Sequence, residues 1–197
     1  MLRISCKELD DTDIIILGRE ELDSVNMPLD KNSTEYNYKD YKGFEENLRC
    51  EIINGVIYDM TPAPSRKHQE ISGELFRQFA NYLQGRPCRV YYPPFDVLLP
   101  NQNEKEEDIT TIVQPDLVIQ ITSKSTAAKD FGLKLSLYEK VGVKEYWIVQ
   151  SDLGIVMVYN LVNGSYGRNT SYSKENPIKV GIFEDLTINL KEVINYQ

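Results

Sequence analysis

The feature that most constrains the fold is an apolar, β-branched run at residues 112–121, IVQPDLVIQI, in which apolar and polar residues do not alternate. This lack of alternation is typical of a strand that is buried on both faces. A helical pattern follows at residues 126–141 and ends at Gly142, and residues 146–149 form another apolar strand pattern. The sequence therefore predicts a buried sheet that has helices packed against it.

Other local signals extend this pattern toward the amino terminus. Asn54 and Gly55 separate two short apolar runs, and this dipeptide supplies the two positive φ angles of a two-residue hairpin turn. An amphipathic helix is predicted from His68 to Gln84, because apolar residues recur at helical spacing, with Ser65 as its cap and Gly85 at its end.

Further strands are expected at residues 89–92, 95–99, 155–159 and 178–183, before a C-terminal segment at residues 190–194. The order of these elements indicates an α/β or α+β fold, with a mixed central sheet flanked by helices. Residues 1–37 show no clear period, and we interpret them as an N-terminal extension to a domain at residues 38–197.

The net charge of −8 argues against a protein that coats nucleic acid through bulk charge alone. The charge is uneven, however, because residues 1–60 carry 14 acidic and 7 basic side chains. Residues 61–95 and residues 117–144 each carry five basic and two acidic side chains. Each segment therefore has a local net positive charge, which would allow nucleic acid to approach an acidic site nearby despite the negative net charge of the chain.

The three cysteines, Cys6, Cys50 and Cys88, are widely spaced and form no CxxC pair. This pattern favours reduced, structural thiols over a disulfide framework or a zinc site. No run of about eighteen apolar residues that would span a membrane is present, nor is the apolar core of a signal peptide. We therefore expect a cytoplasmic protein with no membrane partner.

Sequence motifs for dinucleotide, P-loop, esterase and zincin chemistry are absent, and the single histidine excludes a histidine-based metal cluster. Asp116 is the most informative residue, because a carboxylate in an apolar strand is costly to bury without a partner. Lys134 lies in the helix that follows, and Glu51 precedes the hairpin turn. Carboxylates and a lysine of this kind fit Mg²⁺-dependent phosphodiester hydrolysis, but an ion-paired structural set is also consistent with them.

Several segments in chain order resemble the Uma-type family of restriction endonucleases, which is placed in the PD-(D/E)XK nuclease superfamily. The resemblance runs from about Tyr38 to Val193 and rests on the combination of segments more than on any one of them. Those segments are residues 50–55, 62–65 with His68, 114–116, 123–126, Asp130, Lys134, Tyr138 and residues 142–147.

The resemblance implies a restriction-endonuclease-like fold and Mg²⁺-dependent cleavage of DNA, with Mn²⁺ as a substitute. By its position, Asp116 corresponds to the PD aspartate of the family, which implies that it is a metal ligand. Glu51 corresponds to an acidic residue of the early hairpin, which implies that it helps hold the metal. Lys134 is implied as the catalytic lysine, supplied from a helix. His68 matches a family histidine for which we favour a helix-orienting role. A homodimer is expected by analogy with the superfamily.

Gln120 occupies the catalytic position where the family pattern has a strand glutamate, and a neutral amide is a weak Mg²⁺ ligand and no base. Only three residues separate Asp116 from Gln120, and on one strand they would lie about 13 Å apart along the chain. This spacing is too long for both to bind one ion. We therefore expect that two family segments are joined here, through a true deletion or through a loop left out of the numbering.

Two other functions are consistent with these residues. The replacement of glutamate by Gln120 also fits a catalytically impaired, nuclease-fold protein that serves as a binding or oligomerisation module. A small-molecule enzyme that uses Asp116 and Lys134 as acid and base is a third interpretation. DNA cleavage separates the first function from the second, and nucleic-acid binding separates both from the third.

Overall fold

A computed structural model describes residues 1–6, 36–37, 40–41, 43–44, 50–59, 64–92, 99 and 115–195 of the chain. The chain divides into two compact units. The first unit comprises residues 1–8, 64–95 and 114–197, and the second comprises residues 9–63 and 96–113. The predicted strand at residues 95–99 and most of the run at residues 112–116 lie outside the described residues.

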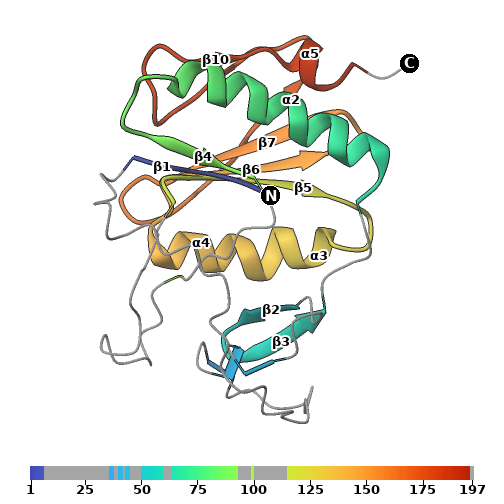
Figure 1. Cartoon of the computed structure of the whole chain (residues 1–197), viewed down its shortest axis with the longest axis vertical. Helices are drawn as coiled ribbons and strands as arrows, with labels where there is room; N and C mark the ends of the chain where they lie inside the picture. The colour runs from blue at the N-terminus through green and yellow to red at the C-terminus, as the bar shows by residue number, and fades with distance from the viewer. Residues whose placement is uncertain are drawn as a thin grey trace. The chain divides into compact units, whose positions relative to one another are not determined.

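The first unit is built on a six-stranded mixed sheet in the order β4-β1-β5-β6-β7-β8 (Figure 1). Only β5 and β6 pair in parallel, and the other neighbours are antiparallel. The mixed central sheet agrees with the predicted fold class. The strands are β1 (Leu2–Ser5), β4 (Arg89–Tyr91), β5 (Leu117–Thr122), β6 (Glu145–Gln150), β7 (Ile155–Asn160) and β8 (Thr170–Ser173).

Helix α2 (Arg66–Leu83) covers one face of this sheet. Its apolar residues Ile71, Leu75 and Phe79 are fully buried in the main core, together with odd-numbered residues of β5 such as Ile119. The Ser65 side chain accepts a hydrogen bond from the His68 backbone N–H at 3.2 Å and caps the helix, as predicted. The same core extends to a small hairpin of β9 (Ile178–Lys179) and β10 (Thr187–Ile188), and to α5 (Leu190–Val193).

The opposite face of the sheet is covered by a helical segment that connects β5 to β6 (Figure 1). The segment consists of α3 (Ala127–Lys129), a π-helical turn named η2 (Asp130–Lys134) and α4 (Leu135–Val141). Gly142 ends it in the left-handed conformation, with φ of 82°, as the sequence predicted. The helix therefore returns from the carboxyl end of β5 to the amino end of β6.

The N-terminal residues differ from the expectation of an extension without core structure. Residues Leu2 and Ile4 of β1 are fully buried, and β1 pairs with β4 on one side and β5 on the other. Four residues are too few to show a period, and their pairing partners lie more than 80 positions away. The boundary at residue 38 itself stays a prediction.

The expectation of three reduced thiols is wrong for two of the cysteines, because Cys6 and Cys88 form a disulfide. The antiparallel register of β1 and β4 explains this pairing. Ser5 lies opposite Arg89, so the next pair in that register is Cys6 and Cys88. Cys50 is buried and lies outside this disulfide.

The second unit contains the predicted hairpin, formed by β2 (Cys50–Ile53) and β3 (Val56–Asp59). Asn54 and Gly55 have φ angles of 52° and 78°, which agree with the expected turn. The hairpin packs with Tyr36 and Phe44 in a small apolar cluster. No helix in the described ranges is long and apolar enough to cross a membrane.

Candidate active site

Asp116 lies at the bend that precedes β5, at the end of the sheet where β5 and β6 begin. Its backbone continues the sheet, because Asp116 N–H donates to Ile4 O at 2.8 Å and Glu145 N–H donates to Asp116 O at 3.1 Å. The residue is 9% exposed, so the structure places a carboxylate near the surface of the core, as the sequence indicated.

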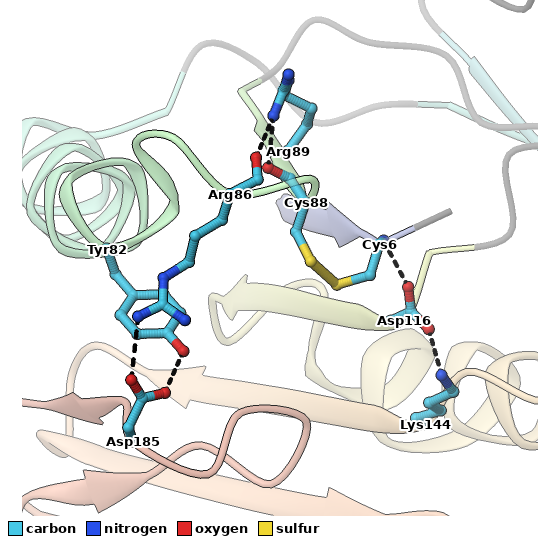
Figure 2. The surroundings of a disulfide bond; sticks show 8 residues. All are labelled: Cys6, Tyr82, Arg86, Cys88, Arg89, Asp116, Lys144 and Asp185. Atoms are coloured by element: carbon cyan, nitrogen blue, oxygen red, sulfur yellow. Dashed lines mark hydrogen bonds and ion pairs between the residues drawn. A yellow bond between two sulfur atoms is a disulfide. The ribbon is translucent and has the colours of Figure 1, made fainter. Parts of the chain in front are cut away.

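Both carboxylate oxygens of Asp116 have partners (Figure 2). The backbone N–H of Cys6 donates to Oδ2 at 2.7 Å, directly beside the disulfide. Lys144 Nζ lies 2.7 Å from Oδ1. These two contacts supply the compensation that a largely buried carboxylate requires. Sequence analysis did not identify this ion pair.

Gln120 lies on β5, on the same face as Asp116, because side chains alternate along a strand. Odd-numbered residues of β5 face the α2 core, so Asp116, Val118 and Gln120 face the helical segment of α3, η2 and α4. The amide oxygen Oε1 of Gln120 is buried and has no hydrogen-bond donor. A buried hydrogen-bond acceptor without a donor is unusual in a folded protein. Its presence is consistent with a cation or a further donor that binds at this face.

Lys134 lies at the end of η2 and is also buried, with its side chain only 6% exposed. Its Nζ lies 3.7 Å from Oδ1 of Asp130, which is fully buried. Both carboxylate oxygens of Asp130 lack a hydrogen-bond donor. The Tyr146 hydroxyl donates to the backbone O of Asp130 at 3.2 Å and so fixes this turn over β6.

The structure thus brings Asp116, Gln120 and Lys134 to one side of the sheet, where the strand face meets the covering helical segment. Glu51 lies on β2 and belongs to the second unit, so its relation to the other three residues stays a prediction. His68 lies in the first turn of α2, on the opposite face of the sheet. Its position fits the helix-orienting role, and burial lowers the pKa of its side chain.

Strand β5 is uninterrupted, and each of its residues pairs with one residue of β6. The register runs from Leu117 opposite Glu145 to Thr122 opposite Gln150. This continuous pairing accommodates no loop between Asp116 and Gln120. Asp116 and Gln120 therefore lie on one continuous stretch of chain, and the origin of their spacing stays a prediction.

Sequence reasoning also missed the buried carboxylate of Glu145, which is 0% exposed. Its Oε1 accepts a hydrogen bond from Trp147 Nε1 at 2.7 Å, and its Oε2 accepts one from Ile182 N–H at 3.0 Å. Burial raises the pKa of Glu145, and these hydrogen bonds oppose the shift. Because its partners are structural donors, Glu145 anchors the loop after β9. The sequence signal that could have revealed it is the position of Glu145 at the start of the apolar strand in KEYWIV.

A magnesium site needs several oxygen ligands, and this face offers only part of them. Across the described ranges, His, Cys, Asp and Glu side chains nowhere gather in groups of three that could hold a metal ion. Asp116 supplies a hard oxygen donor of the kind that Mg²⁺ prefers, but Gln120 lies four positions further along the same stretch of chain, too far for both to bind one ion. A complete set requires a further ligand, for which Glu51 is the sequence-based candidate.

A family model described as "Putative restriction endonuclease" matches residues 35–191 of this sequence. The chain belongs to this family, named Uma2. The match covers nearly all of the segments on which the resemblance was based. It also includes both units, so Glu51 and Asp116 fall within the matched range.

Two further comparisons found proteins similar to this chain. An uncharacterized protein, slr1290 of Synechocystis sp., is 31% identical over 144 residues, covering 65% of this chain and 73% of that protein. A crystal structure described as "a putative nuclease belonging to DUF820" from Anabaena variabilis has a TM-score of 0.55 and 18% identity. It covers 77% of this chain and 92% of that chain, and it shows that the fold is shared.

Proposed function

We propose that this Uma2 protein is a Mg²⁺-dependent DNA endonuclease of the restriction type, which hydrolyses phosphodiester bonds with an activated water. Membership of a restriction-endonuclease family and the shared nuclease fold support this function. The observation that carries it is the position of Asp116, a largely buried carboxylate on the sheet face that the Lys134 helix covers.

Asp116 and Glu51 would hold the metal, and Gln120, at the catalytic position of the family's strand glutamate, is a neutral amide that cannot act as a base. A bound Mg²⁺ lowers the pKa of its water and neutralises charge on the phosphate. The ammonium of Lys134 would position the attacking water or offset the negative charge that builds up on the phosphate. DNA as the partner, a homodimer as the active species and a cytoplasmic location are further parts of this proposal.

A second candidate is a nuclease-fold module that binds or oligomerises without cleaving DNA. Two observations favour it. Gln120 replaces the acidic residue of the family pattern, and Lys144 already neutralises Asp116 at 2.7 Å. In this case Asp116 and Lys144 are a structural ion pair.

Incubation of the purified full chain with DNA distinguishes the two candidates. Supercoiled plasmid, linear duplex and single-stranded DNA are each incubated with Mg²⁺, with Mn²⁺ and with a chelator. The nuclease predicts cleavage of at least one substrate with either metal and none with the chelator. It also predicts loss of cleavage in Lys134→Met and Glu51→Gln, whereas Lys140→Met, a change at an exposed lysine of α4, leaves cleavage intact. If the wild-type protein leaves all three substrates uncut, the binding module is the function.

A further inference from the structure

The disulfide between Cys6 and Cys88 lies directly beside Asp116 (Figure 2). The backbone N–H of Cys6 donates to Oδ2 of Asp116 at 2.7 Å, so one end of the crosslink is also a hydrogen-bond donor to the carboxylate. The other oxygen of Asp116 pairs with Lys144, whose side chain is 67% exposed. Because a long, exposed lysine keeps much of its freedom, the Cys6 amide is the partner that fixes the direction of the carboxylate.

The crosslink holds Cys6 at the point where strand β1 ends. The register of β1 and β4 ends with Ser5 opposite Arg89, so Cys6 lies one residue beyond it and is joined to its neighbour by the disulfide. The rest of β1 is also paired with β5, and Asp116 N–H donates to Ile4 O at 2.8 Å. Opening of the disulfide should therefore free Cys6 and leave the sheet in place.

The Cys6 end is the more accessible end of the disulfide, because Cys6 is half-buried and Cys88 is 7% exposed. A thiolate of a dithiol reductant can attack Sγ of Cys6. The S–S bond then breaks, and the sulfur of Cys88 leaves as a thiolate and takes up a proton. The second thiol of the reductant attacks the mixed disulfide and releases Cys6 as a thiol, so the reductant is oxidised by two electrons. The reverse exchange restores the crosslink.

We propose that the Cys6–Cys88 disulfide is a redox switch for Asp116, in which reduction by a dithiol releases the Cys6 amide from the carboxylate while the sheet stays folded. Disulfides are rare in the cytoplasm, and those found there are usually transient or redox-sensing. The cytoplasmic location that belongs to the proposed function therefore fits a switch better than a permanent crosslink. As a regulator of cleavage, the switch rests on the proposed function, but the loss of the hydrogen bond does not.

Hydrogen exchange of backbone amides, followed by nuclear magnetic resonance on the isotope-labelled full chain, tests the switch without a cleavage assay. The Cys6 amide should be protected in the oxidised protein and should exchange about tenfold faster after reduction with dithiothreitol. The Asp116 amide, which donates to Ile4, is the internal control and should stay equally protected in both states. Cys88→Ser should exchange like reduced wild type, with and without dithiothreitol. Oxidised Asp116→Ala should lose the protection of the Cys6 amide.

Two results of this measurement would overturn the switch. Equal exchange of the Cys6 amide in oxidised and reduced wild type would show that the disulfide does not control the hydrogen bond to Asp116. Loss of protection at the Asp116 amide on reduction would show that the crosslink holds the sheet together, so that it is structural and not a switch.

The nicking rate of supercoiled plasmid tests the regulatory consequence separately. Oxidised wild type is compared with reduced wild type from which the reductant has been removed without oxygen. We expect the reduced form to nick about tenfold more slowly, because a catalytic group that is no longer held in place loses rate. Equal rates in the two forms would overturn the regulatory role. If neither form nicks, the proposed function fails, and the exchange of the Cys6 amide alone decides whether the switch exists.

Discussion

Glu145 is the residue whose ionisation should most clearly affect folding. Burial raises the pKa of its carboxyl above the ordinary value of 4.5, against hydrogen bonds from Trp147 and from the backbone of residues 181 and 182. The folded protein therefore binds this proton more tightly than the unfolded chain does. The contribution of Glu145 to the free energy of unfolding is complete below pH 4.5 and is lost as pH rises through the raised pKa.

Urea unfolding between about pH 4 and pH 8 measures this contribution. Glu145→Gln cannot ionise, so its free energy of unfolding should lack this part of the decline with pH. The variant should also be less stable at low pH by about 1 kcal/mol, because the amide offers one acceptor oxygen to several N–H donors. An unchanged dependence on pH in Glu145→Gln would show that the carboxyl has an ordinary pKa.

The buried pair of Asp130 and Lys134 also gives a prediction at the residue scale. Asp130→Ala removes the carboxylate that lies 3.7 Å from the Lys134 ammonium and should lower the free energy of unfolding by about 3–5 kcal/mol. Replacing both residues with apolar ones, Asp130→Leu with Lys134→Met, should cost much less than Asp130→Ala alone, since no buried charge remains. Urea denaturation of the three proteins measures this difference, and a double variant less stable than Asp130→Ala contradicts the prediction.

At the scale of elements, local signals predicted the parts of the fold that depend on short stretches of chain. The spacing of Ile71, Leu75 and Phe79 predicted α2, and Asn54-Gly55 predicted the hairpin. Strand β1 and the disulfide were missed because both depend on pairing between distant segments. Strands β8 and β10 were also missed, since four and two residues are too few for a periodic pattern.

The candidate site was predictable only in part, for a related physical reason. An aspartate in an apolar run stands out in the sequence, so Asp116 was identified directly. Its partners were not, because Cys6 is 110 residues away and Lys144 lies beyond the helical segment, directly before β6. The burial of Asp130 could not be predicted either. It lies in a π-helical turn, which changes the helical spacing and so changes which residues face the sheet.

The disulfide between Cys6 and Cys88 links the end of β1 to the start of β4 across 82 residues. A crosslink of this kind restricts the unfolded chain, and its removal should lower the free energy of unfolding by about 2–4 kcal/mol. Urea unfolding of wild type with and without a thiol reductant measures the effect. Cys88→Ser is the control, because its unfolding midpoint should not respond to reductant. Equal midpoints for wild type in both conditions would show that the crosslink contributes nothing.

At the scale of the whole molecule, the charge distribution fits a local approach of DNA better than the net charge of −8 suggests. The segment from β5 to Lys144 carries five of the basic residues and two acidic ones. Lys124 and Lys144 are exposed on it, whereas Lys134 is buried. The first unit therefore combines exposed cations with the buried residues of the candidate site.

The nicking rate of supercoiled plasmid in Mn²⁺ by wild type and by Asp116→Asn tests the central claim most directly. Asparagine keeps the size of the side chain and one acceptor oxygen, so circular dichroism and thermal unfolding first establish that the variant folds. We predict that wild type converts the plasmid to open circles and that Asp116→Asn nicks no faster than a sample without protein. A folded Asp116→Asn protein that nicks as fast as wild type would contradict the claim that Asp116 is the carboxylate on which hydrolysis depends.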